Sequence, residues 1–557
     1  KFVNAYKAAY PVSAGGYPSP SLFAYVYYVN TKAALDGLDA VKGDLSGNHA
    51  KYRETLSKMV LKTPTGDVRL DDRAAVAAWG GVRADGATDL ELVLAAYAAR
   101  GAGCLEGMAG DFSLALWDES RGTLTAMRDP FGVKGLYLAE VDGMLLLASR
   151  PAVLGREGEL DEEWVADFLV GAMVPPERTV WGGVRAVAPG QVVTWRGGTL
   201  SRRRYWSAAD FAPEAAVNER AAVESFRALL EEAVRARAGG GVPVWSQLSG
   251  GLDSSSIVCV AQALAGEGRG SGIAGTLTLV ETLGDGDERK YSDAVVRRWG
   301  VRNETVENPW AWQDDGAPPP LTDEPRAHYP FWARDREMVA RVRGAGGRVL
   351  LSGQGSDHYL GGNQGFITDL LAAGRVRAGL GELMRFSVAA RQSFWTGLGR
   401  QGIHPFLPTW LKVRRARPHE QIPEWLDPGF VRGLGVAGRL PVVRRLAVPR
   451  GTSFFAHDVA AELEGLAGML ERGPFQDGIE MRYPFLHRPL VEHSLRLPPS
   501  MRIRPGGGKH VLREAMRGIL PEEIRTRRGK GGIDARLLWA LNRERARLDD
   551  LLRDPEI

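Results

Sequence analysis

The chain has 557 residues, of which 44% are hydrophobic and 25% are charged, an ordinary composition for a soluble globular protein. A chain of this length needs more than one hydrophobic core, so we expect about two to four domains. The net charge of +4 is small and gives no reason to expect binding to nucleic acid or to a membrane. No apolar run approaches the roughly 20 residues that a membrane-spanning helix requires.

The cysteine content and the first residues bear on the cellular compartment. Cys104 and Cys259 are the two cysteines; neither lies at metal-ligand spacing, and two cysteines form no disulfide framework. The first residues, beginning at Lys1, lack the apolar centre of a signal peptide. These features predict a cytoplasmic protein, because the cytoplasm is a reducing compartment.

Residues 1–205 are predicted to form a β-rich domain with intervening helices, because short runs of strand-forming residues are separated by Gly and Asp. An amphipathic helix is expected at 88–100. The segment 206–219, which includes Ala-Pro-Glu, is typical of a linker. The predicted strands are 22–29, 67–70, 112–117, 123–127, 136–139, 144–148 and 191–195.

Residues 220–557 show a different pattern, in which strands alternate with helices. Apolar residues recur at steps of three and four from Val223 to Val234 and predict a helix that ends at Gly239. Alternation of this kind is typical of a parallel sheet covered by helices, and beyond residue 365 the sequence is mostly helical. The predicted strands are 243–248, 276–280 and 348–351, and a helix is predicted at 255–265.

The segment between the first of these strands and its helix is typical of a phosphate-binding loop. Gly250 and Gly251 allow the backbone to approach an anion, and the following helix offers unpaired N–H groups and the positive end of its dipole. Asp253 is itself anionic, so its place in the loop is explained if it holds a Mg²⁺ ion that bridges the phosphates. Hydroxyl donors are available from Ser249, Ser254 and Ser255.

This loop resembles the pyrophosphatase-type loop of enzymes that cleave ATP to AMP and pyrophosphate, and further motifs make the chain similar to the asparagine synthetase superfamily. Leu-Ser-Gly-Gln-Gly-Ser-Asp at 351–357 resembles that family's second signature. The late motifs are matched by Ile-Glu-Met-Arg-Tyr-Pro-Phe-Leu at 479–486, Lys-His-Val-Leu-Arg-Glu at 509–514 and Arg-Gly-Lys at 528–530. Gly-Asp-Phe at 110–112 and Arg-Asp-Pro-Phe-Gly-Val-Lys at 128–134 resemble the glutaminase-type domain.

The resemblance implies an α/β fold in two parts and an enzymatic activity. Residues 1–205 are expected to form an inactive glutamine amidotransferase-like domain, an Ntn-type β-sandwich with helices. Residues 220–557 are expected to form an ATP-dependent synthetase domain, in which a pyrophosphatase loop and a parallel sheet are followed by a helical extension. The implied activity is that of an AMP-forming carbon–nitrogen ligase with ATP and Mg²⁺ as cofactors.

The resemblance also assigns roles to individual residues. Asp253 and Asp357 would share the metal ion, and Lys509 would hold the ATP phosphates. Lys530 would stabilise negative charge at the reaction centre, where a fixed cation favours a developing oxyanion. The cofactor-binding residues would be Ser249, Gly250, Gly251, Asp253, Ser254, Ser255, Gly353 and Leu279.

The sequence departs from the family's pattern at several positions. A working glutaminase needs an N-terminal cysteine as nucleophile, whereas this sequence opens with Lys1, so we expect no glutamine hydrolysis. Gln354 stands where asparagine synthetases carry Glu, and Gln cannot accept a proton as a carboxylate does. His358 and His487 replace acidic residues of the family. His358 could act as a base by its position, but a lone His is more often a structural hydrogen-bonding residue.

Two pairs of charged residues near the late motifs are expected to be structural and not catalytic. Glu462 and Glu464 lie near the position of a catalytic carboxylate in related enzymes, but the sequence favours a surface helix. Glu480 and Arg482 are expected to form a buried structural ion pair.

Superfamily members without the glutaminase cysteine include β-lactam synthetases and the macrolactam synthetases (cyclases) of lasso peptides. Both adenylate a carboxylate and let an amine of the same substrate attack it, so proximity replaces ammonia supply. The segment 369–418 favours the cyclase, because arginines interleaved with aromatic residues suit the wall of a peptide cavity; a solvated helical face is the alternative. These residues are Arg375, Arg377, Arg385, Arg391, Arg400, Lys412, Arg414, Arg415 and Arg417, with Phe394, Trp395, Phe406 and Trp410.

The sequence thus predicts that an Asp or Glu side chain of a peptide is adenylated and closed into an isopeptide ring by the N-terminal amine. The expected partners are the precursor (core) peptide, a leader peptidase and a leader-binding protein, with no nucleic acid and no membrane. Three alternatives stay open. They are an asparagine synthetase-like amidotransferase that uses ammonia, a β-lactam synthetase acting on a small β-amino acid, and a non-catalytic or tRNA-binding relative.

Overall fold

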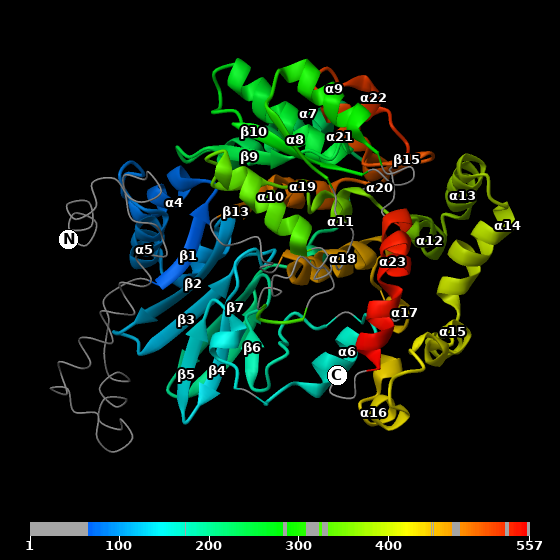
Figure 1. The fold of residues 1–557 in the computed structure, drawn as a ribbon, viewed down its shortest axis with the longest axis horizontal. Coiled ribbons are helices and arrows are strands. Elements are labelled where there is room, and N and C mark those ends of the chain that lie inside the picture. Colours follow the sequence, from blue (N-terminus) through cyan, green and yellow to red (C-terminus); the bar gives the residue numbers. More distant parts are fainter. Residues whose placement is uncertain are drawn as a thin grey trace.

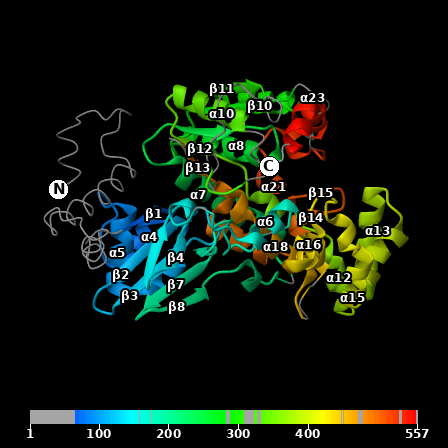
Figure 2. The same cartoon turned by 60° about the horizontal axis from the view of Figure 1, so that its bottom comes forward.

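The computed structural model describes residues 65–553, apart from 157, 173, 215, 282–286, 308–321, 326–331, 447, 449–450, 471–478 and 530–533. Within these residues, antiparallel sheets come first in the chain and are followed by an α/β part built on a parallel sheet (Figures 1 and 2). The fold class predicted from the sequence is confirmed.

The N-terminal part consists of two antiparallel sheets packed face to face. The larger has the order β1 (Thr65–Leu70), β2 (Gly110–Asp118), β3 (Thr123–Arg128), β7 (Gln191–Arg196), β8 (Thr199–Arg204), and the smaller the order β5 (Met144–Ala148), β4 (Tyr137–Val141), β6 (Val184–Ala186). Its helices are α4 (Arg73–Gly80), α5 (Asp89–Arg100) and α6 (Glu162–Leu169). Ala126 and Val193 pack toward the smaller sheet, whereas Met127 and Val192 pack toward α4 and α5. This alternation along each strand buries both faces of the larger sheet.

The C-terminal part is built on a five-stranded sheet in which all strands are parallel. In spatial order the strands are β11 (Asn303–Glu307), β10 (Gly275–Val280), β9 (Val244–Gln247), β12 (Val349–Leu351) and β13 (Glu480–Arg482). The chain runs from β9 to β10 and β11 on one side, and then returns to β12 on the other side of β9. The loops that leave β9 and β12 therefore meet at a topological switch point, where open α/β sheets bind their ligands.

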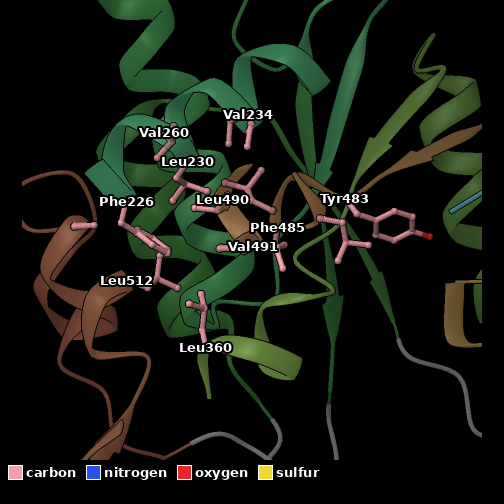
Figure 3. Packing of buried hydrophobic residues seen from close by; sticks show 14 of the residues in the cluster. Phe226, Leu230, Val234, Val260, Leu360, Tyr483, Phe485, Leu490, Val491 and Leu512 are labelled. Carbon is pink, nitrogen blue, oxygen red and sulfur yellow. The ribbon is translucent and has the colours of Figure 1, made fainter. Parts of the chain in front are cut away.

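Helices cover both faces of this sheet. The larger hydrophobic core contains Phe226, Leu230 and Val234, spaced four residues apart on one helix, packed near Leu490 and Leu512 (Figure 3). The helices that contribute to this core include α7 (Glu219–Ala238), α8 (Leu252–Gly266), α9 (Arg289–Trp299), α19 (Arg488–Arg496) and α21 (His510–Ala515). The opposite face packs against α10 (Trp332–Gly344) through a core that includes Trp245 and Leu350.

Beyond β12 the chain is mostly helical, as predicted. The further helices are α11 (Ser356–Leu360), α12 (Gly365–Ala372), α13 (Val376–Ala390), α14 (Phe394–Gly397), α15 (Thr409–Ala416), α16 (Pro428–Gly433), α17 (Pro441–Leu446), α18 (Phe454–Leu470), α20 (Pro499–Arg502), α22 (Glu522–Arg525) and α23 (Asp534–Leu552), with a small hairpin of β14 (Ile503–Arg504) and β15 (Gly507–Gly508). The arginines of 375–417 are all exposed, so this segment forms an outer surface. This exposure fits the solvated helical face given as the alternative, and the expectation that the segment walls a peptide cavity stays a prediction.

Buried charges join the two parts. Arg237 near the end of α7 has no exposed side-chain surface, and its guanidinium donates to Asp71 at 2.9 Å and to Asp111 at 3.2 Å. His487 Nδ1 lies 2.7 Å from Asp71 Oδ2, and Arg69 also contacts both aspartates. Because buried charges are tolerated only when paired, this cluster fixes how the antiparallel sheets sit on the synthetase core.

The local predictions can now be compared with the structure. Every predicted strand within the described residues is present, and Thr88 caps α5 through a reciprocal capping box with Glu91. The strand predicted at 22–29 lies outside the described residues. In the segment 206–219, Trp206 is buried against Phe131, so this connection is packed at its start. Its role as a domain boundary stays a prediction. Within the described residues, none of the helices combines the length and the apolar character needed to cross a bilayer.

Candidate active site

The loop that follows β9 requires glycine for steric reasons. Gly250 has a φ of +75°, and a Cβ there would lie 2.8 Å from the Cβ of Tyr291 and 2.9 Å from the carbonyl oxygen of Glu288. Only glycine meets both demands. Ser249 tightens the turn, because its backbone N–H donates to Ser254 Oγ at 3.1 Å and its own hydroxyl lies 3.0 Å from that oxygen.

The N-terminus of α8 has no side-chain cap. Its N-cap is Gly251, which supplies no side-chain hydrogen bond to the first N–H groups of the helix. Among the described residues, the buried Ser255 Oγ and Asp253 Oδ1 likewise find no hydrogen-bond partner. Buried polar atoms are rarely left without partners. These orphaned groups fit a nucleotide phosphate held by N–H and hydroxyl donors, with a metal ion on the carboxylate.

The loop that follows β12 lies directly against this phosphate loop. A Cβ at Gly353 would stand 2.8 Å from the backbone nitrogen of Ser254 and 3.1 Å from the Cβ of Asp253. Glycine therefore allows the two loops to touch. Asp357 lies in the first turn of α11, which the same loop leads into.

Lys509 joins the two aspartates. Its Nζ lies 2.6 Å from Asp253 Oδ2, 2.6 Å from Asp357 Oδ1 and 3.0 Å from Ser356 Oγ. The lysine side chain is largely buried, whereas Asp357 is 72% exposed and therefore accessible to a ligand. Lys509 has a φ of +59°, and its N–H donates to the carbonyl of Leu360 at 3.2 Å. Such a backbone conformation in a residue other than glycine is uncommon and often occurs at functional sites.

The two carboxylates suit a magnesium ion that is bound together with nucleotide phosphates. Across the part of the chain that the structure describes, no group of three or more His, Cys, Asp or Glu side chains gathers as a metal site. A metal ion held by Asp253 and Asp357 would complete its coordination with phosphate oxygens and water, as Mg²⁺ commonly does at nucleotide sites. When bound, it would neutralise charge on the phosphates that are being displaced.

A contact that sequence reasoning missed anchors the approach to Lys530. Arg527 Nη2 lies 2.6 Å from Glu288 Oε1, and its guanidinium lies 4.0 Å from the ring centre of Tyr291. Glu288 and Tyr291 are the residues that crowd Gly250, so the segment before Lys530 is fixed beside the phosphate loop. Lys530 itself lies outside the described residues. No local signal could reveal a pair separated by 239 positions.

Other predicted residues lie away from this centre or have structural partners. Leu279, near the end of β10, packs against the core on the α10 side of the sheet, and its contact with the nucleotide stays a prediction. Arg482 pairs with Glu480 at 2.9 Å and donates to the carbonyls of Arg237 and Gly239, as expected of a structural pair. Burial would raise the pKa of Glu480, but Arg482 and neighbouring cations lower it to about 2.

His358 lies next to Asp357 in sequence and faces α18. Its Nδ1 is 3.7 Å from Glu462 Oε2. Burial lowers the pKa of His358 below its usual value despite the opposing effect of Glu462. Glu462 and Glu464 lie on α18, as predicted, and Glu464 pairs with Arg204 at 2.9 Å.

Comparisons with known proteins match both parts of the chain to protein families. The family model described as asparagine synthase matches residues 225–557, and the model for a glutamine amidotransferase domain matches residues 74–206. Amidase chyE of Penicillium rubens is 26% identical over 509 residues, which cover 82% of this chain and 74% of that protein. Glutamine-hydrolyzing asparagine synthetase 1 of Bacillus subtilis is 24% identical over 471 residues, which cover 80% of this chain and 71% of that protein.

The asparagine synthase match spans more than half of the chain and contains the phosphate loop, the second signature and Lys509. The reaction class that accompanies this match is ATP-dependent, AMP-forming carbon–nitrogen ligation. The chain therefore belongs to the asparagine synthase family.

Proposed function

We propose that this ligase adenylates an Asp or Glu side chain of a peptide and joins it to the N-terminal amine of the same peptide, as a macrolactam synthetase (cyclase) of the lasso-peptide type. The ligase chemistry is supported mainly by one observation, which is that Asp253, Asp357 and Lys509 converge at the edge of the parallel sheet. Charges fixed in this way favour the transfer of an adenylyl group from metal-bound ATP.

The proposed reaction has two steps. In the first, a carboxylate oxygen forms a bond to the α-phosphorus of ATP, the bond from that phosphorus to the bridging oxygen breaks, and pyrophosphate leaves. In the second, the amine nitrogen bonds to the acyl carbon, the bond to AMP breaks, and the amine releases a proton to solvent. Lys509 turns from the carboxylates to the phosphates in the first step, and Lys530 is proposed to stabilise the tetrahedral oxyanion in the second.

The amine is proposed to come from the substrate itself. Among the described residues of the N-terminal part, Cys104 is the only cysteine. Its Sγ donates to the carbonyl of Gly101 at 3.1 Å, and burial raises the pKa of its thiol, which disfavours the nucleophilic thiolate. In the second signature, Gln354 provides no carboxylate that could act as a base. The first observation disfavours Cys104 as a glutaminase nucleophile, and the second disfavours the attack of free ammonia on an activated aspartate.

An amidotransferase that uses free ammonia is the second candidate, and the similarity to asparagine synthetases favours it. A β-lactam synthetase acting on a small β-amino acid is the third. The three candidates differ in the acyl substrate and in the origin of the amine, so their products distinguish them.

The proposed substrate is the core region of a precursor peptide. A leader peptidase and a leader-binding protein are proposed as partners, because the N-terminal amine has to be released before it can attack. Ordering a flexible peptide before ring closure has an entropic cost. Binding of the peptide to the enzyme has to offset that cost.

Exchange of labelled pyrophosphate into ATP, measured with aspartate, a small β-amino acid and a leaderless core peptide, tests the proposal. We expect exchange with the peptide only, together with a product that is lighter than the peptide by one water. Asp357→Asn should reduce exchange about 100-fold, whereas Glu424→Gln, at an exposed position away from the site, should leave it unchanged. Formation of asparagine from aspartate and free ammonia would establish the second candidate, and absence of exchange with every carboxylate would overturn the ligase mechanism.

A further inference from the structure

The segment 375–417 carries a charge that the rest of the chain does not share. It contains nine Lys and Arg residues and one acidic residue, a net charge of +8, whereas the whole chain has +4. The remaining residues together therefore carry −4. Its helices α13 and α15 lie at the end of the molecule opposite the N-terminal sheets in both views (Figures 1 and 2), and α14 lies beside α13 in Figure 1. We call this segment the basic edge.

The arginines of the basic edge are exposed, and most have no acidic partner. Arg385 pairs with Glu382 at 2.8 Å, and Arg417 pairs with Glu420 at 3.1 Å. No ion pair is found, within the described residues, for Arg375, Arg377, Arg391, Arg400, Arg414 and Arg415. Guanidinium groups present donors in a planar fork that matches a carboxylate, so each of these six arginines can bind an acidic side chain of a partner.

Large apolar side chains are exposed among these arginines. Trp395 on α14 is 75% exposed and Trp410 on α15 is 65% exposed, while Phe406 and Ile403 between them also face solvent. Exposed apolar side chains within one surface segment are candidates for an interaction site. Trp and Arg are the residue types that contribute most at protein–protein interfaces.

From this combination we infer that the basic edge is a docking surface for an acidic polypeptide segment that also carries aromatic or aliphatic side chains. Its carboxylates pair with the free guanidinium groups, and its apolar side chains cover Trp395 and Trp410. The inference is independent of the amide-forming chemistry, because binding here needs neither ATP nor the Lys509 centre.

The charge distribution favours a short acidic polypeptide over a larger polyanion. The residues outside the basic edge sum to −4, so they supply no further net positive charge for a nucleic acid strand or an anionic membrane that extends beyond it. The aromatic residues also lie on separate short elements, since Pro405 and Pro408 interrupt the chain between α14 and α15. A helix that binds a membrane surface instead presents one continuous apolar face.

Binding of a fluorescently labelled random copolymer of glutamate and tyrosine to the full chain tests the inference by anisotropy. The Arg414→Gln/Arg415→Gln variant should bind about tenfold more weakly and with a smaller salt dependence. The control variant Arg196→Gln/Arg202→Gln removes two exposed arginines on β7 and β8 and should bind within about twofold of the parent. Equal losses in the two variants would show that only net charge matters and would overturn the inference.

The aromatic contribution is measured separately. Trp395→Ala/Trp410→Ala should weaken binding about tenfold at low and at high salt, because apolar contacts are not screened. Trp117→Ala, at an exposed position on β2, serves as control, and thermal unfolding midpoints confirm that the variants remain folded. Tighter binding to phosphatidylglycerol vesicles or to single-stranded RNA than to the copolymer would overturn the inference. No binding, or equal binding of a lysine–tyrosine copolymer, would also overturn it.

Discussion

At the scale of single residues, Lys509 holds the candidate active site together. One ammonium group bridges Asp253 and Asp357 at 2.6 Å on each side. Without it, two carboxylates would face each other and repel. A left-handed backbone conformation places this lysine at the start of α21. The side chain thus supplies a positive charge before any metal ion is bound.

Replacing Lys509 by Met should abolish most of the pyrophosphate exchange activity. Methionine has a similar length but no charge, so transition-state stabilisation is lost, and we expect a fall of about 100- to 1000-fold. Lys509→Arg keeps the charge with a different donor geometry and should retain more activity than Lys509→Met. Exchange rates with the cognate carboxylate, alongside thermal unfolding curves, measure both effects. Unchanged exchange in Lys509→Met would contradict the assigned role.

At the scale of elements, the junction between β9 and α8 depends on conformations that only glycine reaches. Gly250 combines a positive φ with close approach to Tyr291 and Glu288. Gly266 ends the same helix without either restriction, since nothing lies within 4 Å of the place where its Cβ would be. The two glycines therefore form a matched pair.

Gly250→Ala and Gly266→Ala should have opposite effects. The left-handed backbone conformation costs alanine at 250 about 1–2 kcal/mol, and its Cβ would also clash with Tyr291 and Glu288. ATP binding should therefore weaken at least about tenfold. Alanine at 266 should instead stabilise the protein by about 0.5–1 kcal/mol. Urea unfolding and the ATP-dependent shift in Tm measure these changes. Equal ATP binding by both variants would show that the loop tolerates a side chain.

At the scale of the whole molecule, the buried charges around Arg237 decide how the two parts of the chain stay together. Burial raises the pKa of Asp71, but Arg237 and Arg69 outweigh that effect and hold it well below its usual range. Burial lowers the pKa of His487, but hydrogen bonds to Asp71 and Glu232 raise it above its usual value. The cluster is therefore most favourable when the histidine is charged and the aspartate is ionised.

The free energy of unfolding should accordingly depend on pH through His487. A raised pKa in the folded state means that its contribution is fully present below the unfolded value of about 6.5 and is lost as pH rises through the folded pKa. His487→Gln should remove this alkaline decline, whereas His419→Gln, at an exposed position, should preserve it. Urea unfolding between about pH 6 and 9 provides the measurement. Identical pH profiles for the parent and His487→Gln would refute the assignment.

Much of the site could be predicted from sequence, because carboxyl ends of neighbouring parallel strands share one edge of a sheet. The loops that carry Asp253 and Asp357 follow such strands, although the pairing of the two aspartates was expected from the family resemblance. The place of Lys509 followed only from family resemblance, since nothing in its local sequence points toward the aspartates. The contacts of Asp71 with Arg237 and His487 join residues that are remote in sequence. Such contacts arise from the packing of whole elements, so no local sequence pattern predicts them.

The contact of Arg527 with Glu288 and Tyr291 has a consequence for how the protein is made. The residues that crowd Gly250 are held by a side chain that the ribosome adds long after the phosphate loop itself. A nascent chain that has not yet reached Arg527 has the loop without this support. We therefore expect tight nucleotide binding to require that the chain extends through Arg527.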